Sequence, residues 1–200
     1  LATLGFLTSQ DTVVNTFTVG QVGIILDEAR VNPQGKPLNE EGNEVENVEE
    51  AYRVDTNNYH LVPGQTYLKD PTLTVVKGSE ESYVRMLVTI SCYDALQTIC
   101  NDAFLPQNFV EGWDSSVWVS TKVVDVDDAA DIATYEFRYS TTVKPSASED
   151  LVLDALFDSF TLPGEIDGDE LAAISDLEIS VVGHAIQAAG FADATAAWAA

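Results

Sequence analysis

Apolar and polar residues alternate with a period of two along much of this 200-residue chain, and no other sequence feature constrains its fold as strongly. In TYEFRYSTTV, residues 134–143, Tyr135, Phe137 and Tyr139 fall on one face of an extended chain, and the residues between them fall on the other. Side chains of a strand point alternately to its two faces, so the pattern predicts a half-buried antiparallel β-strand. The same period predicts strands within residues 15–29, 73–78, 82–90, 116–126 and 177–186.

Short strands separated by Gly, Pro and Asn, with no strand–helix–strand rhythm, favour a β-sandwich or jelly roll. We therefore predict a mainly β chain whose residues 15–200 form one jelly-roll-like antiparallel β-sandwich domain, preceded by an extended segment at residues 1–14. Helical patterns are local and short. They lie at residues 93–104, 167–175 and 191–200, and Asp193 is the expected N-cap of the last.

The charge balance restricts the partners of the chain. Thirty-three acidic residues oppose nine Lys and Arg, which gives a formal net charge of −24. This excess repels phosphate backbones and anionic lipids, so we expect no nucleic-acid partner. No apolar run approaches the ~20 residues that cross a bilayer, so we expect no membrane span. Ionic screening over about 8 Å still allows the acidic subunits to approach one another.

The start at Leu1 is typical of a chain matured by proteolysis or otherwise trimmed, and we expect an exported protein. Cys92 and Cys100 are the two cysteines, eight positions apart. In an exported protein such a pair is typical of a short disulfide loop, and two free buried thiols are the alternative. Neither His60 nor His184 lies at a spacing that would complete a zinc site with them.

Catalytic motifs are missing from the sequence. His184 would be the better general base, yet no G-x-S-x-G elbow, H-E-x-x-H zinc motif or phosphate-binding glycine loop occurs. We therefore predict no catalytic residue and no enzymatic activity, and we expect His184 to be a structural or surface residue of a strand.

One acidic stretch, DVDDAADIATYE, partly matches a calcium-binding EF-hand loop. Its four candidate ligands are Asp125, Asp127, Asp131 and Glu136. However, Ala129 and Ala130 occupy the third-ligand and glycine positions, and the segment continues into a predicted strand. Calcium is therefore the single candidate cofactor, and a solvated acidic turn is the alternative.

A turn motif occupies the middle of the chain, V-P-G-Q-T-Y-L-K-D-P. Pro63 and Gly64 are expected to form a tight turn, and Pro71 gives a rigid entry to the next strand. Lys69 and Asp70 are adjacent, and we expect them to form a local ion pair.

Three stretches share their residues and their order with one family: NTFTVGQVGIILDEARV, NNYHLVPGQTYLKDPTLTVVKGSEESYVRMLVTI and VGHAIQAAGFADATAAWAA. On these motifs the chain resembles the TasA and camelysin family of SipW-dependent exported proteins. The resemblance implies a secreted subunit of an extracellular fibre in the biofilm matrix, built on a jelly-roll sandwich. It also implies that the subunits form a head-to-tail homopolymer, in which the N-terminal segment of each completes the sheet of its neighbour.

The first ten residues, LATLGFLTSQ, carry no charge, and this suits such a donor strand. A donor strand needs alternating apolar side chains and free backbone groups that pair with an open sheet edge. We expect Ala2, Leu4 and Phe6 to fill pockets of the neighbour and Leu7 to contact the opposite face. The receiving edge is expected near residues 17–26 or 177–186. In the alternative, the segment is the first strand of its own sheet or is frayed.

Two other functional classes stay open. A monomeric cell-surface adhesin or matrix protein could use the same sandwich, with other matrix or cell-wall components as its partners. The family also includes a surface endopeptidase of the camelysin type, but the missing zinc motif argues against carrying that activity over.

Overall fold

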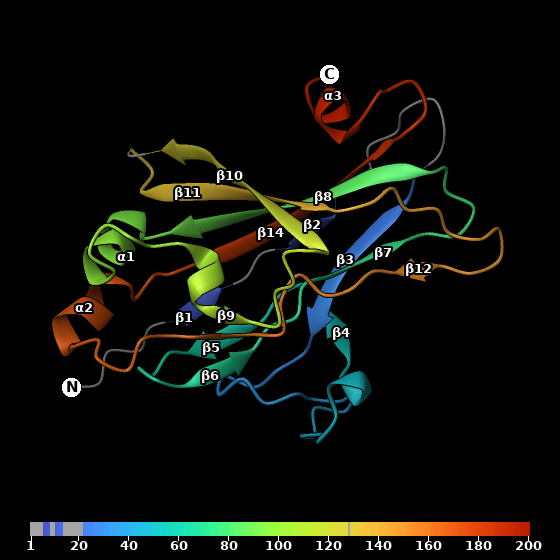
Figure 1. The fold of residues 1–200 in the computed structure, drawn as a ribbon. Helices are drawn as coiled ribbons and strands as arrows, with labels where there is room; N and C mark the ends of the chain where they lie inside the picture. The colour runs from blue at the N-terminus through green and yellow to red at the C-terminus, as the bar shows by residue number, and fades with distance from the viewer. Residues whose placement is uncertain (1–5, 9–10, 14–21, 128) are drawn as a thin grey trace.

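The computed structural model describes residues 6–8, 11–13, 22–127 and 129–200. Within these ranges the chain forms several β-sheets, which are mainly antiparallel, and three short α-helices (Figure 1). The expected mainly β class is confirmed. No helix in these ranges is long and apolar enough to cross a membrane.

The largest sheet has five strands and forms one layer of the molecule (Figure 1). In spatial order they are β10 (Trp118–Asp127), β11 (Ile132–Tyr139), β8 (Ser82–Ser91), β14 (Ile179–Gln187) and β2 (Asp11–Val13). Neighbouring strands are antiparallel except β14 and β2, which are parallel. β8, β10, β11 and β14 coincide with four predicted strands, and the burial of β8 and most of β14 alternates residue by residue as expected.

The opposite layer consists of smaller sheets. A four-stranded sheet contains β12 (Leu151–Val152), β7 (Thr72–Val75), β3 (Ile24–Ala29) and β4 (Arg53–Val54). A three-stranded sheet contains β6 (Thr66–Leu68), β13 (Ser159–Thr161) and β9 (Val110–Glu111). β1 (Phe6–Thr8) and β5 (Asn58–His60) form a two-stranded sheet.

The helices lie at the ends and on the outer face of the five-stranded sheet (Figure 1). They are α1 (Tyr93–Ile99), α2 (Gly168–Ala173) and α3 (Ala194–Trp198), with short 3-10 turns η1 (Val48–Glu50) and η2 (Pro106–Asn108). All three α-helices fall within predicted segments, and Asp193 caps α3 by accepting from Ala196 N at 2.8 Å, as expected. α1 ends earlier than predicted because Asn101 and Asp102 adopt left-handed backbone angles, with φ of 54° and 60°.

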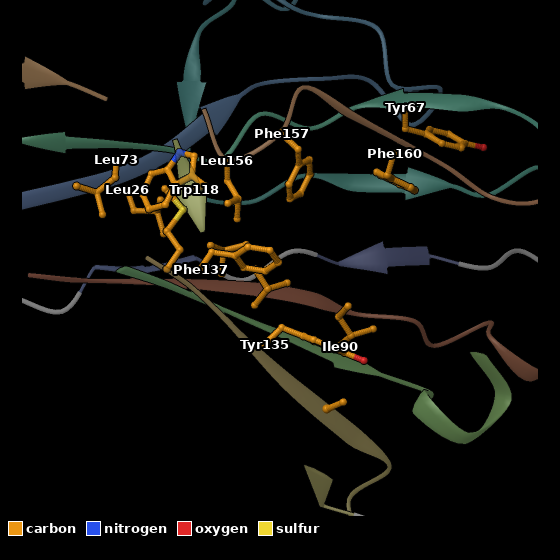
Figure 2. Packing of buried hydrophobic residues seen from close by; sticks show 14 of the residues in the cluster. Leu26, Tyr67, Leu73, Ile90, Trp118, Tyr135, Phe137, Leu156, Phe157 and Phe160 are labelled. Atoms are coloured by element: carbon orange, nitrogen blue, oxygen red, sulfur yellow. The ribbon is translucent and has the colours of Figure 1, made fainter. Parts of the chain in front are cut away.

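The hydrophobic core fills the space between the two layers (Figure 2). From the five-stranded sheet it receives the alternating residues of β8, Val84, Met86, Val88 and Ile90. Leu26 and Leu73 enter from the opposite layer, with Trp118 fully buried among them. Phe157, just before β13, and Phe160, within it, are buried as well.

Candidate functional site

The N-terminal segment pairs with two strands of its own chain. β1 runs antiparallel to β5, and β2 runs parallel to β14. The paired residues are Phe6–His60, Leu7–Tyr59, Thr8–Asn58, Asp11–Val181, Thr12–Val182 and Val13–Gly183. Of the expected donor-strand residues, Phe6 and Leu7 thus belong to β1, whereas Ala2 and Leu4 lie outside the described residues. For the part of this segment that is described, the arrangement is that of the alternative, a strand of the chain's own sheets.

These pairings cover two sheet edges. Within the described chain, β1 is the only strand paired with β5, and β2 covers the side of β14 that faces away from β8. Without the N-terminal segment, backbone N–H and C=O groups of β14 and β5 would be left unpaired, although His60 N still donates to Pro33 O and His60 O still accepts from Tyr67. β14 begins within residues 177–186, one of the two regions expected to form a receiving edge, and ends one residue after that region.

An apolar cavity lies between the layers beside these edges. Val88 and Ile90 of β8, Ile179 of β14, Leu96 of α1, Phe104 and Phe160 contribute to its lining. Phe160 also packs edge-on against Tyr59 of β5, with ring centroids 5.3 Å apart. The cavity is thus lined in part by β14, and one of its lining residues contacts β5, while its lining suits apolar side chains.

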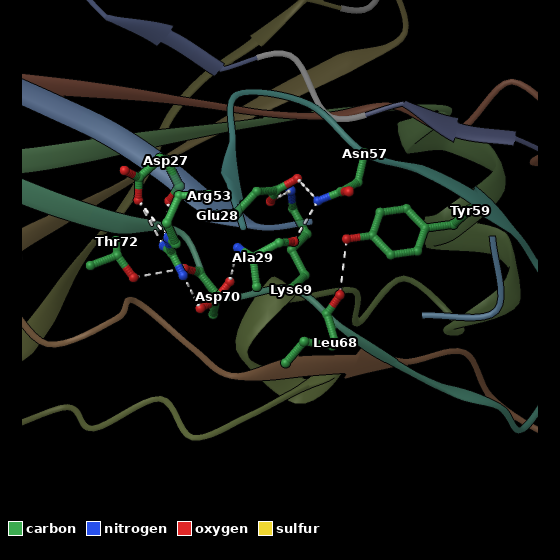
Figure 3. A network of polar contacts seen from close by, with 10 residues as sticks. All are labelled: Asp27, Glu28, Ala29, Arg53, Asn57, Tyr59, Leu68, Lys69, Asp70 and Thr72. Atoms are coloured by element: carbon green, nitrogen blue, oxygen red, sulfur yellow. Dashed lines mark hydrogen bonds and ion pairs between the residues drawn. The ribbon is translucent and has the colours of Figure 1, made fainter. Parts of the chain in front are cut away.

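A network of buried charges lies where β3 passes the ends of β4, β5 and β6 (Figure 3). Lys69 and Glu28 form an ion pair with both side chains fully buried. Asp70 instead pairs with Arg53, which also contacts Asp27 at 2.8 Å. The expected local pair between Lys69 and Asp70 is therefore wrong: adjacent residues of an extended chain point in opposite directions, and each finds a different partner.

Sequence reasoning missed Glu28, which pairs with Lys69, and Asn57, which donates to the same carboxylate. The alternation in β3 held a usable signal, because Glu28 falls on the same face as Ile24 and Leu26, which are both buried. A carboxylate at an inward-facing position needs a buried partner. No comparable signal marks Asn57, which lies in a polar stretch before β5.

A second polar cluster lies on the outer face of the five-stranded sheet. Glu136 of β11 pairs with Arg85 of β8 and with Arg138, each at 2.9 Å, and accepts from Thr121. Burial alone would raise the pKa of Glu136, but the hydrogen bonds from Thr121, Arg138 and Arg85 lower it. Arg85 also donates from Nε to His184 Nδ1 at 3.1 Å. His184 therefore contacts an arginine and not a nucleophile, as fits a structural residue.

The cysteines lie at opposite ends of α1. Cys92 is its N-cap and Cys100 its C-cap, and both are half-buried free thiols. An α-helix rises about 1.5 Å per residue, so eight residues span about 12 Å. A disulfide needs Cα atoms within about 7 Å. The expected disulfide is thus absent from the structure and would require α1 to unwind. Burial raises the pKa of both thiols.

The four calcium candidates have other partners or lie apart. Asp127 accepts from the backbone of the following turn at Ala129 and Ala130, and Asp131 accepts from Asp94 N at the start of α1. Glu136 faces the arginines, and Asp125 is exposed on β10. Among the residues that the structure describes, no three His, Cys, Asp or Glu side chains are grouped to hold a metal ion.

Comparisons of the chain with models of protein families, with curated proteins and with solved structures found no match.

Proposed function

We propose that this chain is the structural subunit of an extracellular filament, with a jelly-roll-like sandwich as its body and residues 1–14 as a donor strand. Subunits join head to tail when the N-terminal segment of one covers the β5 and β14 edges of the next. The observation that carries the proposal is the pairing of β1 with β5 and of β2 with β14, because one segment covers two separate edges by strand addition.

The exchange needs no new kind of contact. A segment that pairs with its own edges can make the same pairings with a second copy, and such a head-to-tail contact does not close on itself but extends into a filament. Two pairings of three residues provide few backbone hydrogen bonds, each contributing about 1 kcal/mol net. Most of the binding free energy must then come from apolar side chains, which fits the uncharged sequence LATLGFLTSQ and the apolar cavity that β14 helps to line.

Composition and motifs support the extracellular setting. The resemblance to the TasA and camelysin family comes from strand and turn motifs of the body and from the segment around Asp193. High negative charge keeps subunits soluble before assembly, and salt would favour their approach.

A cross-linking experiment distinguishes exchange from self-pairing. Thr8 lies opposite Asn58 in the antiparallel pair, so a Thr8→Cys, Asn58→Cys variant places two thiols within reach of a disulfide. In electron micrographs the secreted variant should form filaments, and oxidised filaments should give a ladder of covalent oligomers on a non-reducing gel. Thr8→Cys alone is the control. Filaments whose cross-links stay within single chains would contradict strand exchange.

A charge substitution tests the donor segment itself. Phe6→Glu should prevent filament formation while leaving a folded monomer, because an unpaired carboxylate would have to enter a neighbour's apolar groove. Tyr52→Glu, at an exposed aromatic residue in a loop, is the matched control and should polymerise normally. Secreted material that contains only monomers for the unmodified chain would favour the adhesin class instead.

A further inference from the structure

Glu28, Asn57 and Lys69 meet in the interior, although they come from three separate places in the fold (Figure 3). Glu28 belongs to β3, Asn57 precedes β5 and Lys69 follows β6. Their exposed fractions are 0%, 4% and 0%. Lysine and glutamate are rarely buried completely, and an ion pair loses much of its Coulombic gain to desolvation. The complete burial of this ion pair therefore suggests that the three side chains have a chemical role besides pairing.

One carboxylate bridges an amine and a carboxamide. Glu28 Oε2 lies 2.5 Å from Lys69 Nζ, and Glu28 Oε1 accepts from Asn57 Nδ2 at 2.8 Å. In Figure 3 the side chains of Lys69 and Asn57 both point toward this carboxylate. A group in this position can take a proton from the amine and give one to the amide nitrogen.

The orientation of the Asn57 amide is fixed by the backbone of β3 and the residues after it. Its Oδ1 accepts from Val31 N at 2.8 Å, and its Nδ2 donates to Ala29 O at 2.8 Å as well as to Glu28. Only the oxygen can accept from an N–H group, so the amide has a single orientation. The Val31 N–H is also placed to stabilise negative charge that develops on Oδ1 during attack at Cγ.

We propose that Lys69 and Asn57 become joined by an intramolecular isopeptide bond, with Glu28 as the proton-transfer group. A proton passes from Lys69 Nζ to the Glu28 carboxylate, and the free amine attacks Cγ of Asn57. The new C–N bond forms as the bond between Cγ and Nδ2 breaks. Proton transfers through Glu28 from the attacking nitrogen to the leaving one release the latter as ammonia. The products are an amide between the two side chains, ammonia and a neutral Glu28, so atoms and charge balance without any oxidant.

The apolar surroundings suit this step. Tyr59 is fully buried next to the site and donates to the carbonyl oxygen of Leu68, the residue before Lys69. Complete burial of Glu28 and Lys69 excludes bulk water from the reacting groups. The bond would join the segment before β5 to the segment after β6 and close a loop of residues 57–69. Unlike a disulfide, it resists reducing agents, as suits a protein exposed to the environment.

The decisive test uses the unmodified full-length chain. After purification and reduction, its intact mass should be lower than the sequence mass by one molecule of ammonia. Trypsin should fail to cut after Lys69 and should release residues 54–77 as one peptide that lacks this ammonia. Fragmentation of that peptide should give no backbone cleavage products between positions 57 and 69. A chain at its full sequence mass would overturn the proposal.

Two controls separate the bond from other routes to the same mass. Cyclisation of Asn57 alone also releases ammonia, but it leaves Lys69 open to trypsin. A peptide of residues 54–69 that ends at Lys69 and lacks one ammonia would therefore refute the bond. Glu28→Gln keeps the shape of the side chain but cannot transfer protons, and it should restore the full mass. Lys77→Arg, at an exposed lysine, should keep the deficit. If Glu28→Gln does not fold, the mass of the unmodified chain still decides.

Discussion

The guanidinium of Arg85 lies over the indole ring of Trp198, with its carbon 4.2 Å from the ring centroid. Arg85 belongs to β8 and Trp198 ends α3, so this contact attaches the C-terminal helix to the outer face of the five-stranded sheet (Figure 1). Arg138 adds a long hydrogen bond to Thr195, at 3.4 Å. Ala197 of α3 is buried as well, so apolar packing and these two contacts together hold the helix.

We therefore expect Trp198→Ala to release α3 from the sheet. A cation–π contact contributes about 0.5–2 kcal/mol, and the half-buried indole adds apolar contact. Unfolding in urea should show a loss of roughly 1–3 kcal/mol. Hydrogen exchange should accelerate at residues 194–198 and remain slow in β8. Trp198→Phe keeps an aromatic ring and should lose less. Equal exchange rates in the variant and the unmodified chain would show that α3 is held by other contacts.

The hydrogen bond from Arg85 to His184 makes stability depend on pH. His184 Nδ1 can accept this bond only while the imidazole is neutral. Burial lowers the pKa of His184, and the charge of Arg85 lowers it further, although Glu136 acts in the opposite direction. The folded-state pKa is thus below the unfolded one, near 6.5. The resulting stability is complete above about pH 6.5 and is lost as the pH falls through the folded pKa.

His184→Asn tests this dependence, because its amide oxygen can accept the bond from Arg85 and does not titrate. Urea midpoints of the variant and the unmodified chain should be compared between pH 5 and pH 8. As the pH falls, the midpoint of the unmodified chain should fall relative to that of the variant, until the two are equal or the variant is the more stable. His60→Gln is the control and should follow the unmodified chain. The many carboxylates affect both proteins alike, so the difference between them isolates His184. A constant difference across the range would contradict the assignment.

The thiols of Cys92 and Cys100 should be titratable without reductant. In urea, a thiol reagent should count two free thiols per chain, and the melting midpoint should be the same with and without reducing agent. In the folded protein both should react slowly at pH 7 and faster at higher pH, because burial raises their pKa. Cys92→Ser with Cys100→Ser is the control for background reaction. A midpoint that falls in reductant would restore the disulfide.

Alternation predicted β8, β10, β11 and β14, and β8 and most of β14 face the core on one side only. Residue by residue, Val84, Met86, Val88 and Ile90 are buried as the pattern requires. Three helical segments were predicted, with Asp193 as the cap of the last, but the end of α1 was not, because left-handed angles at Asn101 and Asp102 stop that helix. Local rules do not say which strands become neighbours, so β14 between β8 and β2 could not be read from the sequence.

The candidate sites were harder to predict for the same reason. Lys69 pairs with Glu28 across 41 positions of sequence, whereas sequence reasoning reached only its neighbour Asp70. A buried carboxylate on the inner face of β3 was the one readable sign. The spacing of Cys92 and Cys100 suggested a disulfide because spacing alone ignores the rise of the helix between them.

A last prediction concerns Gly35, which lies against the strand that leads to Lys69. Gly35 has φ of +78°, and a Cβ there would lie 2.8 Å from the backbone Cα of Tyr67 in β6. Tyr67 is fully buried, so its backbone cannot move away easily. Gly35→Ala should therefore combine an unfavourable left-handed angle, about 1–2 kcal/mol, with a clash that the fold must absorb.

Gly42→Ala provides the matched control. Gly42 has a similar φ of +86°, but nothing lies within 4 Å of its added Cβ. Gly42→Ala should lose only the stability that the left-handed backbone angle costs, about 1–2 kcal/mol. The difference between the two urea midpoints measures how tightly Gly35 packs against β6. Equal losses of stability in both variants would mean that the Tyr67 backbone shifts freely. The inference that Gly35 packs tightly against β6 would then be wrong.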